Sequence, residues 1–318
     1  MTDISTIIDH VTLHTCIYNA AGCWDVTPEE LYELSESSSG AVVTKSSTLK
    51  PRKGNHQPRL YVTTHGSINS MGIPNLGFDF YKDFAKKITN KPYIQSIAPF
   101  SIDEMIDMLS RINEHRDNVL VEINLSCPNL KGKSIVALDF NELGKYLGAL
   151  QEYCTPVGTH NLVLGLKLPP YFVPEQFDEI TKLLIQTPCI KFITCCNSLC
   201  NGLMIDSDNE TTQIYPKGGL GGVGGLYLKP IALANVRNFY ERIGHLVSII
   251  GCGGVATGRD VFEYILCGAS AVQVGTTLIK QTPECFEILN NELMQIMKNK
   301  NYVCINDFRG KLKKNEGC

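Results

Sequence analysis

The sequence predicts a (β/α)8 barrel, in which eight parallel strands alternate with helices around one closed sheet. Eight short apolar runs recur along the 318 residues, and helical patterns lie between most of them. Several of these runs are continuous rather than alternating, as expected for strands buried on both faces of a parallel sheet. An open doubly wound sheet would place G-x-G-x-x-G directly after its first strand, and the sequence there reads Ala20-Ala21-Gly22-Cys23-Trp24.

The apolar runs give the expected strands in chain order. Each is four to eight residues long, which is the length of a buried strand rather than of a helix. They cover residues 17–22, 41–45, 93–98, 119–125, 162–168, 190–196, 247–252 and 271–275.

Several helices are marked by capping residues. Thr27-Pro28-Glu29-Glu30 offers a hydroxyl that accepts a backbone hydrogen bond, a proline in the first turn and a glutamate that reaches back. Ser101-Ile102-Asp103-Glu104 repeats the capping box, and Thr282-Pro283 is expected to open the last long helix. Further helices are predicted over 141–153, 174–186, 230–243 and 259–267.

Composition argues against several classes of protein. The 29 basic and 32 acidic residues give a net charge of −3, whereas a nucleic-acid-binding protein normally carries a basic field. No stretch approaches the roughly 18 consecutive apolar residues of a membrane helix. The first Lys or Arg is Lys45, so neither a secretory signal nor a mitochondrial presequence is expected. The thirteen cysteines form no C-x-x-C or zinc spacing, which predicts reduced thiols in a cytoplasmic protein without a metal site.

We expect one catalytic domain over residues 1–318, with segment 1–16 packing on the barrel. Segments 46–77, 126–134 and 199–228 are expected to form active-site loops at the C-terminal face. The third of these holds six glycines between Gly218 and Gly225. Such a tract either makes a flexible linker or lets the backbone approach a ligand, and strands of the same barrel on both sides favour the second.

Chemistry in this fold is found where the strands end. Lys45 and Lys167 each end an apolar strand, and a buried ammonium needs a partner. One interpretation is a Schiff-base nucleophile; the other is a fixed cation for a cofactor ring or a substrate carboxylate. Amide side chains recognise planar heterocycles, so the asparagines at the same end, Asn124 and Asn197, favour the fixed cation.

Two further features of the strand ends predict a site. Gly253, Gly254, Gly275 and Thr276 follow the last two strands, where barrels commonly bind phosphate through bare backbone N–H groups. Cys127 follows the fourth strand in a polar loop, where a thiol could act as a base or a nucleophile. Cys195, Cys196 and Cys200 are expected in the core or at its rim.

Four longer motifs carry a family resemblance. They are GSINSMGIPNLGFDFY at 66–81, EINLSCPN at 122–129, KLPPYF at 167–172 and FRGK at 308–311. In this order, and over nearly the whole chain, they resemble the class 1A dihydroorotate dehydrogenases, the FMN flavoproteins of pyrimidine synthesis.

The resemblance implies a function. The chain would oxidise (S)-dihydroorotate to orotate on the route to UMP, passing a hydride to N5 of FMN while Cys127 removes the C5 proton. Fumarate would then reoxidise the flavin in the same pocket and leave as succinate, in a ping-pong cycle. The loop around Cys127 would exclude water. The resemblance also implies a cytoplasmic homodimer with no nucleic-acid or membrane partner.

The resemblance assigns two overlapping sets of site residues. The cofactor set is Ala20, Ala21, Gly22, Lys45, Ser46, Asn124, Lys167, Cys196, Gly225, Cys252, Gly253, Gly254, Gly275 and Thr276. The substrate set is Lys45, Asn69, Ser70, Met71, Gly72, Ile73, Asn124, Asn129, Asn197 and Ser198.

The chain departs from the family pattern at several positions. Ile73 replaces a leucine, which we expect to be a mild change. Pro99 follows Ala98 where a glycine is usual, Leu199-Cys200 removes a glycine near the substrate, and Leu220 replaces an aromatic residue.

Four alternative functions remain open at this point. One is a class 1B enzyme, which needs an iron–sulfur partner protein, and another is the membrane-bound quinone class, which uses a serine base. A third is a Schiff-base lyase acting through Lys167, and the last is a flavin- or phosphate-binding barrel without activity.

Overall fold

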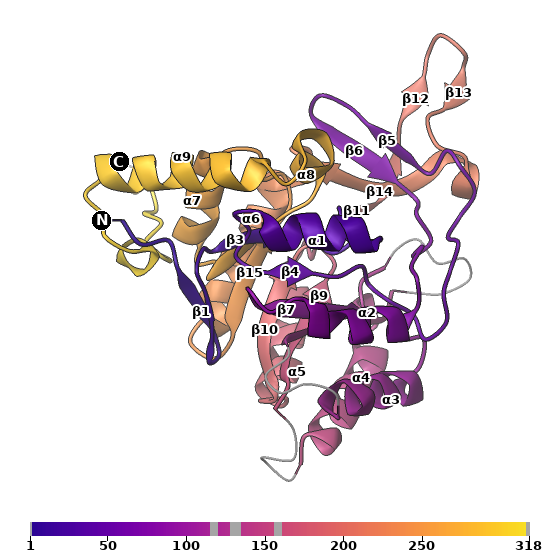
Figure 1. The fold of residues 1–318 in the computed structure, drawn as a ribbon, viewed down its shortest axis with the longest axis horizontal. Coiled ribbons are helices and arrows are strands. Elements are labelled where there is room, and N and C mark those ends of the chain that lie inside the picture. The colour runs from indigo at the N-terminus through magenta and orange to yellow at the C-terminus, as the bar shows by residue number, and fades with distance from the viewer. Residues whose placement is uncertain (1, 115–119, 128–134, 156–160, 316–318) are drawn as a thin grey trace.

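An eight-stranded parallel sheet forms the centre of the molecule, with helices outside it (Figure 1). The computed structural model describes residues 2–114, 120–127, 135–155 and 161–315. In pairing order the strands are β3 (Ile17–Asn19), β16 (Ala271–Val274), β15 (Ser248–Cys252), β10 (Ile190–Cys195), β9 (Val163–Leu168), β8 (Leu120–Asn124), β7 (Tyr93–Ile97) and β4 (Val42–Val43).

A few hydrogen bonds hold the two end strands of this sheet, β3 and β4, side by side. The Gly40 N–H donates to the Ile17 carbonyl at 2.8 Å. The Asn19 amide replaces the missing ladder, because its oxygen accepts from the Val43 N–H at 2.8 Å and its nitrogen donates to the Val43 carbonyl at 2.7 Å. The sheet therefore closes into the barrel that the sequence predicts.

Each barrel strand leads into a helix, as the alternating pattern predicts. Thr27 and Thr257 cap their helices through reciprocal bonds with Glu30 and Asp260. The last long helix begins at Cys285, two residues after the expected start at Pro283, because Thr282 ends the preceding short helix with a φ of +58°. The helices are α1 (Pro28–Glu36), α2 (Phe78–Phe84), α3 (Ile102–Asn113), α4 (Phe140–Tyr153), α5 (Pro174–Ile185), α6 (Lys229–Ile243), α7 (Gly258–Cys267), α8 (Thr276–Gln281) and α9 (Cys285–Asn299), with 3-10 turns η1 (Ala85–Lys87), η2 (Val136–Leu138), η3 (Pro216–Gly219) and η4 (Ile305–Asp307).

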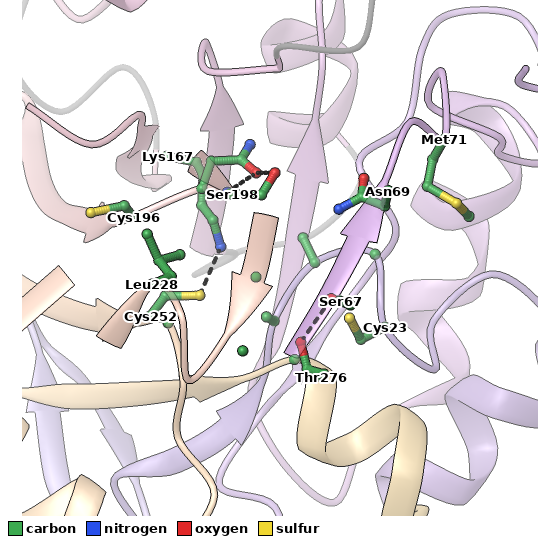
Figure 2. Close-up of a pocket in the computed structure, with 18 of the residues that line it drawn as sticks. Cys23, Ser67, Asn69, Met71, Lys167, Cys196, Ser198, Leu228, Cys252 and Thr276 are labelled. Atoms are coloured by element: carbon green, nitrogen blue, oxygen red, sulfur yellow. Dashed lines mark hydrogen bonds between the residues drawn. The ribbon is translucent and has the colours of Figure 1, made fainter. Parts of the chain in front are cut away.

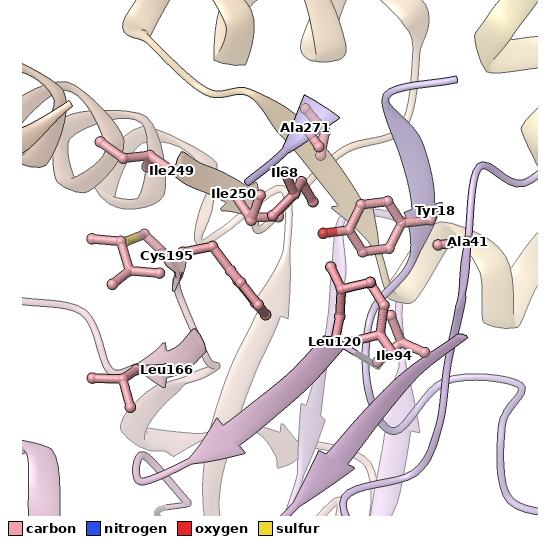
Figure 3. Packing of buried hydrophobic residues seen from close by; sticks show 14 of the residues in the cluster. Ile8, Tyr18, Ala41, Ile94, Leu120, Leu166, Cys195, Ile249, Ile250 and Ala271 are labelled. Atoms are coloured by element: carbon pink, nitrogen blue, oxygen red, sulfur yellow. The ribbon is translucent and has the colours of Figure 1, made fainter. Parts of the chain in front are cut away.

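Apolar side chains from the strands and helices form one continuous core. Ile94, Leu120 and Leu166, on three neighbouring strands, are buried in it (Figure 3). Burying a side chain of this size contributes about 1.5–3 kcal/mol. This core fixes the ends of the strands, and with them the side chains that follow each strand.

Two segments expected as loops contain strands. The segment after β4 holds β5 (Leu60–Val62) and β6 (Gly66–Asn69), and the segment after β10 holds β11 (Leu199–Leu203) and β14 (Leu220–Gly225). They form an antiparallel sheet in the order β11–β14–β6–β5, and the hairpin of β12 (Ile205–Asp206) and β13 (Thr211–Thr212) projects beyond it (Figure 1). The glycine-rich tract is thus mostly a strand, and a Cβ on Gly225 would lie only 2.4 Å from the Gly66 Cα.

The N-terminal hairpin pairs β1 (Thr6–Ile8) with β2 (Val11–Leu13). Ile8 and Leu13 are buried in the core, and the Thr6 hydroxyl donates to the Ser270 carbonyl at 2.7 Å. Among the described helices, none is both long and apolar enough to cross a membrane.

Candidate active site

A cavity with about 1050 Å³ of empty space, including its open mouth, lies where the barrel strands end. The barrel supplies its floor, and β6 with β14 supplies part of its wall. Figure 2 shows Lys167 and Cys252 on one side of it, with Ser67, Asn69 and Thr276 on another. The fold therefore gathers residues from most of the chain around one space.

Lys167, the lysine near the end of β9, is held in a buried polar network. Its ammonium donates to Gln273 Oε1 at 2.6 Å and lies 3.6 Å from Cys252 Sγ and 4.0 Å from Glu122 Oε1. Glu122 Oε2 accepts bonds from Thr194 at 2.8 Å and from Gln273 at 2.7 Å. Burial lowers the pKa of Lys167, but Cys252 and Glu122 raise it by more, so its pKa is above the ordinary value. Lys167 is a fixed cation at neutral pH.

Lys45, the second strand-end lysine, lies against the Gly22 turn. A Cβ on Gly22 would stand 3.0 Å from Lys45 Nζ, and the φ of Gly22 is +104°. Both facts favour glycine here, since a side chain would strain the turn and press on the ammonium. Asp25, behind the same turn, is fully buried and accepts the Gly22 N–H at 2.6 Å.

The asparagines at the strand ends are fixed by a chain of hydrogen bonds. Asn124 Nδ2 donates to Ser46 Oγ at 3.1 Å, and Asn124 Oδ1 accepts from Ser126 Oγ at 3.0 Å. Asn197 Nδ2 donates to the same Ser126 oxygen at 3.0 Å, and Asn197 Oδ1 accepts the Ser198 N–H at 2.7 Å. The amides are thus oriented before any ligand enters, which is what recognition of a planar heterocycle needs.

Four cysteines line the cavity, and three of them have thiols that stay protonated at neutral pH. Burial raises the pKa of Cys23 to about 12 and also raises the pKa values of Cys196 and Cys252. Cys127 differs because it is half-buried, and it also borders a smaller neighbouring cavity with Ile73, Pro99 and Tyr146. Cys127 is therefore the lining thiol best placed to exchange a proton with a ligand.

The far end of the cavity has the bare backbone of a phosphate site. Gly225, Gly254 and Gly275 line it beside Thr276, whose hydroxyl lies 3.2 Å from Ser67 Oγ. Gly254 has a φ of +68°, and a Cβ there would lie 2.7 Å from the Gly225 carbonyl oxygen. A Cβ on Gly275 would point towards Cys23 and Ala20, at 3.5 and 3.7 Å, and so into the cavity lining. This end of the cavity fits an anion held by main-chain groups.

Most residues assigned from the sequence border this cavity. Ser46 lies just behind it, bonded to Asn124, and Ser70 is buried outside the lining. Asn129 and most of segment 126–134 lie outside the described residues. The predicted residues that line the cavity are Ala20, Ala21, Gly22, Lys45, Asn69, Met71, Gly72, Ile73, Asn124, Cys127, Lys167, Cys196, Asn197, Ser198, Gly225, Cys252, Gly253, Gly254, Gly275 and Thr276.

Sequence reasoning missed several lining residues. Cys23 and Gly224 are next to predicted ones, so a wider window around each strand end would have included them. Ser67 belongs to the 66–81 motif, but its bond to Thr276 depends on a strand that was not predicted. Leu60, Leu228 and Ile279 are apolar and carried no signal in the sequence.

The departures from the family pattern fall at different distances from the cavity. Ile73 lines it with a backbone φ of +54°, which a β-branched residue rarely adopts, so the change from leucine is less mild than expected. Cys200 lies on β11, and Leu220 is 41% exposed on β14.

Within the described residues, no group of three or more His, Cys, Asp or Glu side chains could hold a metal ion.

Known proteins resemble the chain in sequence. The dihydroorotate dehydrogenase family model matches residues 4–297. Dihydroorotate dehydrogenase A (fumarate) of Lactococcus lactis is 47% identical over 300 residues, covering 93% of this chain and 94% of that protein. Dihydroorotate dehydrogenase (fumarate) of Kluyveromyces lactis is 45% identical over 302 residues, with the same two coverages.

Solved structures resemble the fold. Ligand-free dihydroorotate dehydrogenase from Eimeria tenella superposes with a TM-score of 0.79 at 23% identity, covering 97% of this chain and 91% of that one. At this identity the likeness shows the barrel alone. The match over most of the chain, at well over 30% identity, shows more, and this chain belongs to the dihydroorotate dehydrogenase family of oxidoreductases.

Proposed function

We propose that the chain oxidises dihydroorotate to orotate, with FMN bound at the barrel mouth and fumarate as the second substrate. The observation that carries this proposal is the convergence of one half-buried thiol, two lysines and an oriented amide network on one cavity. The relatives named as fumarate-using enzymes support the choice of acceptor.

The cavity has the features that FMN needs. The glycines at its far end would hold the phosphate, and Lys167 would place a fixed positive charge against the ring. A Cβ on Gly225 or Gly254 would collide with neighbouring backbone, so a larger residue at either position would distort the wall of the proposed phosphate site. FMN, when bound, supplies an acceptor for the hydride and can pass it on.

The amide network would hold the substrate. Asn69, Asn124 and Asn197 present donors and acceptors to a planar ring, and the substrate carboxylate would lie against Lys45. Because the network is already bonded internally, little reorganisation is required when the substrate enters.

Cys127 would remove the C5 proton of dihydroorotate. It lines the cavity, while the three neighbouring thiols are held in their protonated forms by burial. When fumarate follows into the same cavity, Cys127 would hold the proton that fumarate needs. One thiol would thus serve both half-reactions, and ping-pong kinetics would follow.

A Schiff-base lyase is less compatible with the site. Amine attack on a carbonyl needs a neutral lysine, which enzymes obtain by lowering its pKa. The pKa of Lys167 is raised instead.

The test of the proposed function is a visible spectrum of the purified protein. A flavin spectrum should bleach anaerobically with dihydroorotate and return when fumarate is added. Protein without bound flavin, or flavin that dihydroorotate does not bleach, would contradict the proposal. Turnover of dihydroorotate with fumarate by the purified chain alone would also exclude a class 1B enzyme, which needs a partner protein.

The base can be tested with Cys127→Ser. A serine hydroxyl is a much weaker acid than a thiol, so we expect flavin reduction to slow by about 10²–10⁴ at neutral pH with flavin still bound. Rapid mixing with dihydroorotate measures this rate. Cys23→Ser is the matched control, because Cys23 lines the same cavity but belongs to neither the cofactor set nor the substrate set. Equal rates for Cys127→Ser and the unmodified protein would remove Cys127 from the proposal.

We further propose that the protein is a cytoplasmic homodimer, as the resemblance implies. Light scattering of the purified protein tests the dimer, and a monomeric mass at working concentration would exclude it.

A further inference from the structure

Asp25, in the turn between β3 and α1, is a buried carboxylate that the proposed function does not use. Its side chain is fully buried, and its Oδ2 accepts the Gly22 N–H at 2.6 Å. Its Oδ1 has no hydrogen-bond partner among the described residues. An incompletely bonded carboxylate in the interior is costly, so its presence calls for an explanation beyond packing.

Gly22 separates Asp25 from the cavity. The Gly22 N–H contacts Asp25, and a Cβ on Gly22 would lie 3.0 Å from Lys45 Nζ. The Lys45 N–H in turn donates to the Asp25 carbonyl at 3.2 Å. Asp25 is therefore behind the cavity wall at the point where Lys45 is in front of it.

The surroundings of Asp25 both raise and lower the pKa of its carboxyl group. Burial raises the pKa of its carboxyl to about 7, while Lys45 and the Gly22 N–H oppose the rise. An ordinary aspartate is ionised throughout the physiological range, whereas this one changes charge within it. The titratable groups that interact with it are Lys45, Lys167 on β9, Glu30 on α1, Tyr81 on α2 and Cys23 in the same turn.

We propose that Asp25 is a positioning residue that controls, through its own protonation, how much of the Lys45 charge is available to an anionic ligand. With a proton on Asp25, Lys45 faces the ligand carboxylate as a full cation. Without that proton, the Asp25 carboxylate offsets the Lys45 charge across Gly22. The inference rests on the proposed function, since it takes orotate and dihydroorotate as the anions.

Proton uptake on binding follows from this arrangement. A carboxylate placed next to Lys45 favours the neutral form of Asp25, so near pH 7 binding draws a fraction of a proton from the solvent onto Asp25. The ligand carboxylate stays ionised over this range. We expect orotate affinity to fall about three- to tenfold between pH 6 and pH 8, as the Asp25 proton is lost.

The experiment is titration of the flavin-loaded protein with orotate, by calorimetry, in buffers of different ionisation enthalpy. The dependence of the heat on the buffer counts the protons taken up. All proteins carry Cys127→Ser, so the active-site thiol cannot contribute to the count. Asp25→Asn keeps an oxygen for the Gly22 N–H but cannot ionise. Asp103→Asn, which removes an exposed carboxylate in the first turn of α3, is the matched control.

The parent protein and Asp103→Asn should bind orotate more weakly as pH rises through 7 and take up about 0.3–0.5 of a proton there. Asp25→Asn should bind with one affinity from pH 6 to pH 8 and take up none. The same pH dependence in Asp25→Asn as in the parent would overturn the proposal, even if the variant were less stable. No proton uptake by the parent would overturn it without any need for the variant. If orotate binds no protein at any pH, the proposed function fails and this inference fails with it.

Discussion

At Ile73 the cavity wall adopts a backbone conformation that suits the side chain poorly. Its φ is +54° and the residue is 4% exposed, so neither the chain nor the side chain can move easily. Branching at Cβ adds to the cost of the left-handed region, because two heavy atoms crowd the backbone. Ile73→Leu should therefore raise the free energy of unfolding by about 0.5–1 kcal/mol, which thermal or urea unfolding measures.

The control for this change is Ile68→Leu. Ile68 is buried on β6, an extended strand where branching at Cβ is favourable. This variant should be neutral or destabilised. Stabilisation by both changes, or by neither, would show that the backbone at position 73 is not the cause.

Asp25 should also make the free energy of unfolding depend on pH. Because burial raises the pKa of Asp25 to about 7, the folded state holds the proton more tightly than the unfolded chain does. Its favourable contribution is complete below about pH 4 and is lost as pH rises through 7, a difference of roughly 4 kcal/mol. Asp25→Asn removes this loss, so the Tm of the variant relative to the unmodified protein should rise between pH 5 and pH 8. A constant difference in Tm over that range would contradict the assignment.

The sequence could predict residues at strand ends but not their surroundings. Lys45, Lys167 and Asn124 were identifiable because each ends an apolar run, and parallel strands bring such ends together. Asp25 carried no such signal, since it lies in a turn and ends no apolar run. The strain at Ile73 is equally invisible in the sequence, because it is a property of the backbone.

At the scale of elements, strands that are not all neighbours in the sheet share one charge network inside the barrel. Lys167 comes from β9, Glu122 from β8 and Gln273 from β16. The Glu122 side chain is fully buried, with Oε1 4.0 Å from the Lys167 ammonium. Lys167→Met should therefore cost about 3–5 kcal/mol of stability, since it leaves a buried carboxylate without its cation.

The double variant Lys167→Met with Glu122→Gln separates this effect from lost packing. The second change removes the uncompensated charge, so it should recover more than half of the lost stability. Both variants should also retain little flavin. An equal cost of Lys167→Met in the two backgrounds would show that the carboxylate does not matter.

Strand and helix prediction succeeded where packing against the barrel decides the structure. All eight apolar runs became barrel strands, with ends within three residues of those expected. It failed for β14, because glycine is poor in strands and its tract pairs only with β6 and β11 from distant parts of the chain. It also misplaced the start of α9, because the proline at 283 follows a turn rather than opening the helix.

The closure of the whole barrel depends on a side chain. Asn19 makes two hydrogen bonds to the Val43 backbone, of 2.7 and 2.8 Å, where the backbone pairing of β3 and β4 is incomplete. Asn19→Ala should leave one buried N–H and one buried carbonyl unpaired, at a cost of about 2–4 kcal/mol. Urea unfolding measures this loss, and Asn238→Ala on α6 is a control in which two bonds within one helix are lost, to Ala234 and Arg242. Equal effects of the two changes would mean that the barrel closes without Asn19.

The cavity draws its walls from Ala20 near one end of the chain to Ile279 near the other. During synthesis on a ribosome, the barrel strands emerge one after another, but Gly275 and Thr276 arrive only with the last of them. A nascent chain that lacks them already holds most of the cavity lining but lacks part of the end that fits an anion. A product that is truncated before Gly275 should therefore bind the proposed cofactor more weakly than the full chain does.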